Sequence, residues 1–201
     1  MEPATTRKPR TQPAEKRRDD LMNAAQKLFI EHGVPGTTIE QIALGADLSK
    51  GAFYLHFTSK EEIHLALCER FCRHYSATVR EAIAKRPKKD WRGKVTAWAR
   101  ASTAGLLDQG DLVNMLFHVH PIPADTGWDE IVVTPLLELL DAGVRQGAWE
   151  LSDSRFTATF LYSGLHGVVD DALMSKGRAS RAQIVREVEA VCVTALKLSR
   201  S

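Results

Sequence analysis

The chain has 201 residues, of which 44% are hydrophobic and 26% charged, and its formal net charge is +2. This length can bury one substantial core, or hold a small module joined to a larger one. No apolar run approaches the roughly 20 residues that cross a bilayer, and residues 1–20 contain no signal-peptide core, so we expect a cytoplasmic protein with no membrane partner. The three cysteines form no disulfide framework, and the small net charge does not itself indicate nucleic acid.

Residues 1–14 contain three prolines and several basic side chains, without apolar periodicity. This composition predicts a disordered basic arm. Two interpretations stay open: a solvated tail, or an arm whose arginines reach phosphates or an adjacent minor groove. The first predicted helix then covers residues 15–32, with Leu21 and Phe29 on its apolar face and Gly33 as its C-cap.

Residues 37–60 contain three helix starts within one short stretch. Thr38 followed by Gln41 has the spacing of a capping box and opens the first helix. Asp47 belongs to the few non-glycine residue types that tolerate a left-handed backbone, so it can lie in a turn, and Ser49 can then cap a second short helix. Two short helices across a tight turn predict a helix-turn-helix, which places its second helix in a major groove.

A third capping pattern, Ser59 with Glu62, opens a long helix that we expect to reach about residue 85. From residue 17 to residue 67 the chain resembles the DNA-binding module of the TetR family of transcriptional regulators. The matching residues are Phe29, Gly33, Thr38, Ile42, Ala43, Ser49, Gly51, Tyr54, Phe57, Lys60 and Glu61. One departure is Asp47, because the family usually has glycine there, and we expect this to alter the turn geometry slightly.

The residues expected to contact DNA lie at the two helix starts and along the second helix. In the resemblance Tyr54 and Lys60 map to phosphate contacts, and Lys50 could donate to guanine or to a phosphate. Gly51 and Ala52 are small enough for the backbone to approach base edges. The full set is Thr37, Thr38, Ser49, Lys50, Gly51, Ala52, Tyr54, His56 and Lys60.

The rest of the chain reads as helices, with no sustained strand alternation. Further apolar helical stretches cover residues 91–99, 106–117, 128–145, 153–175 and 180–198, with a break near Gly110 and a kink expected at Pro135. We therefore predict an all-α chain of about nine helices. Its predicted parts are a helix-turn-helix domain at residues 15–60 and an effector-binding and dimerisation domain at residues 61–201.

Aromatic and histidine side chains are frequent in the second domain, where the resemblance implies a small-molecule cavity. The predicted lining is Phe71, His74, Tyr75, Trp98, Met115, Phe117, His118, Trp128, Tyr162 and His166. Each aromatic taken alone is more often part of a core than of a pocket lining, and it is the group that favours a cavity. Because few of these side chains are charged, we expect an apolar or aromatic effector, with one hydrogen-bonding or acidic group for a histidine or Arg100.

The last two helices carry apolar surfaces wider than one core face, which indicates burial on a second side. The resemblance implies that they form a four-helix bundle with a second copy. The predicted interface residues are Leu161, Leu165, Val168, Ile184, Val188 and Val191. A two-fold homodimer would read a palindromic operator in double-stranded DNA, although an ordinary monomeric core stays an alternative.

Other chemistry has weaker support in the sequence. His64, Cys68 and Cys72 recur every four residues on one helix, which leaves a metal or thiol sensor open beside plain burial, and His118 with His120 is equally ambiguous. We find no nucleophile elbow, phosphate loop or metal motif, so we expect no enzyme, cofactor or metal site. The sequence thus predicts a ligand-released repressor, with a helical enzyme or an adaptor as alternatives.

Overall fold

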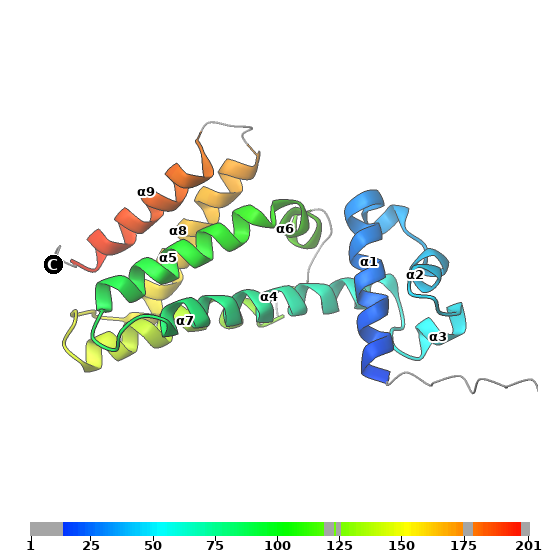
Figure 1. The fold of residues 1–201 in the computed structure, drawn as a ribbon, viewed down its shortest axis with the longest axis horizontal. Helices are drawn as coiled ribbons and strands as arrows, with labels where there is room; N and C mark the ends of the chain where they lie inside the picture. Colours follow the sequence, from blue (N-terminus) through cyan, green and yellow to red (C-terminus); the bar gives the residue numbers. More distant parts are fainter. Residues whose placement is uncertain (1–13, 119–122, 124–125, 175–178, 198–201) are drawn as a thin grey trace, which may run out of the picture. The chain divides into compact units, whose positions relative to one another are not determined.

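The computed structural model describes residues 14–118, 123, 126–174 and 179–197. Within them lie nine helices and no strand, which confirms the predicted all-α fold (Figure 1). The helices are α1 (Ala14–Gly36), α2 (Ile39–Gly45), α3 (Lys50–Tyr54), α4 (Lys60–Ala84), α5 (Trp91–Asp108), α6 (Gly110–Phe117), α7 (Trp128–Arg145), α8 (Ser154–Met174) and α9 (Arg181–Ala195). The predicted arm lies outside the described residues except for Ala14, which begins α1, and His120 also lies outside them.

The chain divides into two compact units, residues 1–67 and residues 68–201, called here the N-terminal and C-terminal units. The division falls inside α4, seven residues after the boundary expected from the sequence. Among the helices of the described residues, none combines the length and apolar character needed to span a bilayer.

Local sequence explains the helix ends of the N-terminal unit. Gly33 adopts a φ of 73°, which a side chain would strain, and α1 turns there before its last residues. Thr38 forms the predicted capping box, since its hydroxyl accepts from the Gln41 amide while its own amide donates to Gln41 Oε1. Asp47 has a φ of 56°, and Ser49 caps α3 by accepting from the Ala52 amide.

The end of α3 and the start of α4 differ slightly from the sequence prediction. Ser59 Oγ accepts from the Glu62 amide, as expected. The Glu62 carboxylate, however, accepts from the backbone and hydroxyl of Thr58 instead of returning to the cap residue. The bond to Thr58 lowers the pKa of Glu62.

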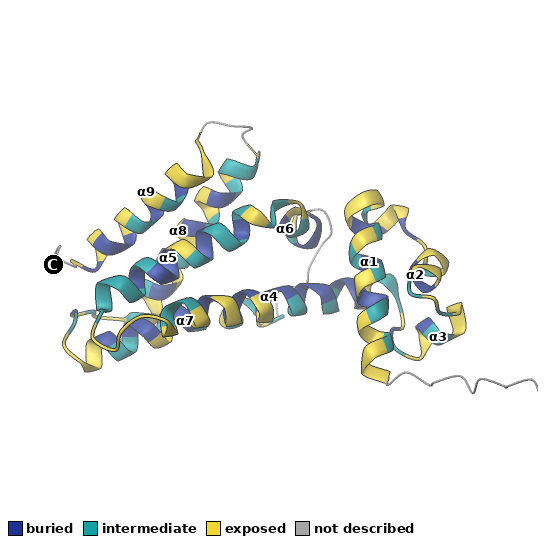
Figure 2. Cartoon of the chain, viewed as in Figure 1, coloured by how far each residue is buried: buried dark blue, intermediate teal, exposed yellow. Residues whose placement is uncertain are grey.

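The C-terminal unit is a bundle in which α5 packs against α9 and α8, and α7 packs against α8 and α5. Buried side chains line the inner faces of these helices, while their outer faces are exposed (Figure 2). Gln109 separates α5 from α6 next to Gly110, as predicted, and α7 continues through Pro135 to Arg145. Trp149 closes one end, because its indole Nε1 donates to the Leu140 carbonyl at 3.0 Å.

Candidate functional site

Helix α3 presents a mostly polar face with small residues at its start. Lys50 and Gly51 are exposed, Ala52 and His56 are half-buried, and Tyr54 keeps 49% of its surface accessible. These five residues were all predicted to meet DNA, and the structure brings them together on one short element and its C-terminal turn. Side-chain donors and an approachable backbone are therefore accessible together on this short element.

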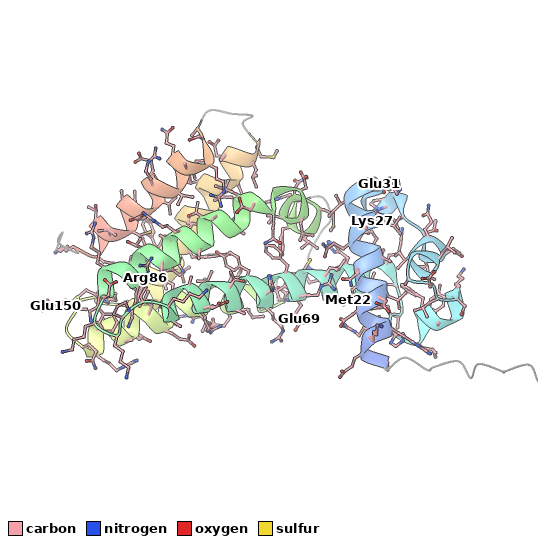
Figure 3. All side chains as sticks on the ribbon, viewed as in Figure 1. Met22, Lys27, Glu31, Glu69, Arg86 and Glu150 are labelled. Atoms are coloured by element: carbon pink, nitrogen blue, oxygen red, sulfur yellow. The ribbon has the colours of Figure 1, made fainter. Side chains whose placement is uncertain are left out.

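Buried rings support α3 from behind. Phe53 and Phe57 are 0% and 1% exposed, and their ring centroids lie 5.9 Å apart. Arg18 places its guanidinium 4.8 Å from the centroid of Phe57 and donates to the Sδ atom of Met22. Met22 lies on α1 (Figure 3). Helix α1 thereby holds the turn after α3 in place.

Gly51 has room for a small side chain. A Cβ built at Gly51 would have Ser49 Oγ, 3.8 Å away, as its nearest neighbour. The glycine is therefore not required by packing within the N-terminal unit. Its lack of a side chain matters for what can approach α3 from outside.

Lys50 forms an ion pair with Glu40, so α3 is tied to α2 by its first residue. Hydrogen bonding to Lys50 lowers the pKa of the Glu40 carboxyl. Both side chains are more than half exposed, and such surface pairs contribute little to stability. No short-range sequence pattern predicts this pair, because ten residues separate its members.

Thr37 requires a correction. The sequence placed its hydroxyl at a phosphate, but the residue is 1% exposed and its hydroxyl donates to the Gly33 carbonyl at 2.9 Å. That bond satisfies a carbonyl at the end of the main part of α1. Thr38 and Ser49 are exposed, as their predicted role requires.

Lys60 also has a role that the sequence did not predict. Its ammonium donates to the carbonyl oxygens of Thr37 at 2.7 Å and Val34 at 2.9 Å, so it caps the segment between α1 and α2. A longer contact of 3.5 Å joins the same ammonium to the Pro35 carbonyl, so three carbonyls of the N-terminal unit surround it. Sequence reasoning also missed two exposed apolar residues, Leu44 on α2 and Leu55 directly after α3, which are 76% and 79% exposed. Leucines in such a segment normally indicate core, so nothing in the sequence marked them.

A shallow groove of about 680 Å³ lies between α1 and the α2–α3 turn. Lys16, Arg17 and Lys27 line it, and Lys27 projects from α1 beside Glu31 (Figure 3). Asp20 and Asp47 line the same groove and offset part of this charge.

The C-terminal unit holds a cavity of about 320 Å³ between α4, α5, α6, α7 and α8. Its described lining residues are Phe71, Cys72, Leu106, Val113, Phe117, His118, Pro123, Thr126, Trp128, Asp129, Val132, Tyr162 and His166. Six of the ten residues expected to line a pocket are among them: Phe71, Phe117, His118, Trp128, Tyr162 and His166. Sequence reasoning missed the aliphatic lining and Asp129, since residues of these types occur throughout the chain.

The other four predicted lining residues lie elsewhere. Trp98, Met115 and Tyr75 are buried at 1%, 5% and 4% exposure and belong to the core, whereas His74 is exposed. Arg100 was expected to meet an acidic effector, but it bonds to Glu189 of α9 at 2.6 Å. The assignments of these side chains to the cavity are corrected accordingly.

The titratable side chains at the cavity include two carboxylates and two histidines. Asp170 lies 3.1 Å from His166 Nδ1 and 3.6 Å from His118 Nε2, so one carboxylate faces both histidines. Burial, followed by the charges of nearby acidic groups that include Asp129 and Asp170, raises the pKa of Tyr162. The lining contains no lysine or arginine among the described residues.

The thiols of the C-terminal unit are buried and protonated. Burial raises the pKa of Cys68 and of Cys72 to about 12, and that of Cys192 to about 11. Within the described residues, no group of three or more His, Cys, Asp or Glu side chains could hold a metal ion. A redox sensor needs an accessible thiolate, so this environment does not favour one.

The predicted dimer interface needs partial correction. Leu161, Leu165, Ile184 and Val188 are 3–7% exposed, because they pack into the core of the C-terminal unit. Val168 and Val191 remain 47% and 63% exposed. Phe156 and Phe160 on α8 were not assigned to the interface, yet they are 69% and 67% exposed and stack with ring centroids 6.3 Å apart.

Comparison with known proteins agrees with the geometry of the N-terminal unit. Residues 21–67 match the model of the bacterial regulatory proteins of the tetR family. The HTH-type transcriptional activator FasR of Mycolicibacterium smegmatis is 35% identical over 71 residues, which cover 35% of this chain and 32% of FasR. The HTH-type transcriptional repressor KstR2 of Mycobacterium tuberculosis H37Rv is 37% identical over 67 residues, which cover 33% of this chain and 34% of KstR2.

These alignments span about a third of the relatives' own length. Over the whole chain the likeness is one of fold: the structure of the fatty acid degradation regulator FadR from Bacillus halodurans has a TM-score of 0.73 and 20% identity, and the match covers 94% of this chain and 96% of FadR.

Proposed function

Because this chain belongs to the TetR family of bacterial regulatory proteins, through residues 21–67, we propose that it is a dimeric DNA-binding transcriptional regulator released by a small effector. One observation carries the proposal: the capped α2–turn–α3 segment, which rests on buried rings and presents Lys50, Gly51 and Tyr54 outward. A short helix exposed in this way can enter a major groove.

The second copy of the chain would dock on α8 and α9. Phe156, Phe160 and Val168 form an exposed apolar stripe on α8, and Val191 is exposed on α9. Large exposed apolar side chains that gather on one face mark interaction surfaces. A two-fold pairing through this face would place two α3 helices on one operator, which would then be palindromic.

The cavity of the C-terminal unit supplies the effector site. Helix α4 carries Phe71 and Cys72 at this cavity, and its first residue, Lys60, belongs to the N-terminal unit. An effector that binds the non-operator form more tightly would lower operator affinity by its differential affinity for the two forms. We propose repression as the output, as the name of KstR2 indicates for that relative, although FasR is named an activator.

Binding to DNA from the neighbourhood of the chain's own gene tests the proposal. Fluorescence anisotropy across a salt series should show specific binding that weakens as salt rises, because phosphate contacts release counterions. A scrambled duplex of equal length and a Lys50→Ala, Tyr54→Phe double variant are the controls. If the affinity for the scrambled duplex equals that for the genomic duplex, the result would contradict a sequence-specific regulator and favour an adaptor.

The oligomeric state is tested separately by light scattering coupled to size exclusion. The full chain should have the mass of a dimer, and Phe160→Ser should shift it toward the monomer. Leu55→Ser serves as the matched control, because Leu55 is also exposed and apolar but lies in the N-terminal unit. If the wild-type chain is a monomer, the proposed two-fold dimer is wrong, and a palindromic operator is no longer expected.

A further inference from the structure

Aromatic side chains line the cavity from four helices, α4, α6, α7 and α8. Phe71 and Phe117 meet edge to face with centroids 5.6 Å apart, and Phe117 meets Trp128 in the same way at 6.3 Å. Tyr162 lines the cavity from α8. The faces of aromatic rings carry negative potential, so a group of rings around one space favours a cation over an anion.

Two carboxylates lie in or next to the cavity lining. Asp129 is itself a lining residue, and Asp170 faces the lining residues His118 and His166. The described lining offers no lysine or arginine that could neutralise an anionic ligand. Burial and then the charge of Asp129 raise the pKa of Cys72, which is also a lining residue.

The size of the cavity bounds the ligand. A volume of about 320 Å³ lies at the small end of ligand sites, which run from about 300 to 1,000 Å³. From the rings, the carboxylates and this volume, we propose that the cavity binds a small organic monocation, a quaternary or protonated amine with a compact aromatic or apolar body. Naming this cation as the effector rests on the proposed function, whereas its binding does not.

Three probes that share one phenyl ring test the inference on the full chain without DNA. Benzyltrimethylammonium is the cation, neopentylbenzene is its neutral isostere, and 3-phenylpropionate is an anion. Titration calorimetry, with equilibrium dialysis for the poorly soluble isostere, should give the cation at least about tenfold tighter binding than the isostere, since cation–π contacts and a nearby carboxylate both favour it. Equal binding of cation and isostere, or tighter binding of the anion, would overturn the inference.

Two matched variants test whether the carboxylate of Asp129 attracts the cation. Asp129→Asn keeps the size of the side chain and should weaken cation binding severalfold, with little change for neopentylbenzene. Glu150→Gln removes an equal charge from an exposed residue outside the cavity lining and should leave both affinities unchanged (Figure 3). If both variants lose the same amount of cation affinity, the cation is attracted by the overall charge of the protein and not by Asp129. That result would also overturn the assignment of a cation site to this cavity. Failure of cation binding, with specific DNA binding retained, would refute only this inference and leave the regulator proposal standing.

Discussion

The ammonium of Lys60 lies 2.7 Å from the carbonyl oxygen of Thr37, and it joins the first residue of α4 to the segment that precedes α2. A second bond, to Val34, makes Lys60 a cap for carbonyls at the end of α1. The residue that family resemblance assigns to a DNA phosphate therefore also organises the N-terminal unit.

Lys60→Met, which keeps the aliphatic stem, should lower the free energy of unfolding by about 1–2 kcal/mol, because charge-assisted bonds to two carbonyls are lost. Urea denaturation measures this loss. Lys85→Met is the matched control, since Lys85 has an exposed ion pair with Glu81 just beyond the other end of the same helix. If Lys60→Met abolishes DNA binding but leaves the urea midpoint unchanged, Lys60 acts on a phosphate and not as a cap.

Gly51→Ala separates DNA affinity from stability. The alanine meets no close neighbour within the N-terminal unit, and alanine favours helix over glycine by about 1 kcal/mol, so stability should stay equal or rise slightly. If the backbone of α3 approaches base edges, the same change should weaken specific binding at least about tenfold. Unchanged operator affinity would show that Gly51 does not face the bases.

The sequence predicted the helices well because their starts depend on local chemistry. Thr38, Ser49 and Ser59 cap helices as expected, since a cap needs only a hydroxyl and the amide three residues later. It predicted less of the site. Burial of Thr37 and the bonds of Lys60 depend on residues up to 26 positions away, and no short-range spacing encodes such contacts.

The same limit explains the errors in the C-terminal unit. Trp98 and Phe117 are both aromatic residues on apolar helix faces, yet only Phe117 lines the cavity. Which face of a helix turns to a cavity, to the core or to a second copy is decided by tertiary packing. Leu161 and Val168 on α8 show the same difference between core and exposed surface.

Gly143 tests the packing that closes the bundle. A Cβ there would lie 2.0 Å from Trp149 Cζ2, so Gly143→Ala must displace the indole that bonds to Leu140. We expect a loss of about 1–3 kcal/mol, as is usual for overpacking, measured by thermal or urea unfolding. Gly105→Ala is the control, because its Cβ would meet Tyr75 at an ordinary 3.7 Å and should not destabilise the helix. Equal stability of both variants would contradict the close Gly143–Trp149 contact.

Alkaline pH should weaken the fold through the buried thiols. The pKa of Cys68 and of Cys72 rises from 9.0 to about 12 on folding, because burial disfavours the thiolate. Between pH 9 and pH 12 the folded thiols therefore keep protons that the unfolded chain has lost, so stability must fall as pH rises in this window. While a thiol is protonated in the folded chain and ionised in the unfolded chain, it should lower the free energy of unfolding by about 1.4 kcal/mol per pH unit above 9.

Urea midpoints at pH 7, 8, 9 and 10 in a reducing buffer measure this dependence. The midpoint should be nearly constant from pH 7 to pH 8 and fall clearly by pH 10. Cys72→Ala should make the fall shallower than in the parent chain, whatever its effect on stability at pH 7, because one shifted group is gone. A midpoint as high at pH 10 as at pH 8 would mean that Cys68 and Cys72 are accessible to water, and it would reopen a role for them as reactive thiols.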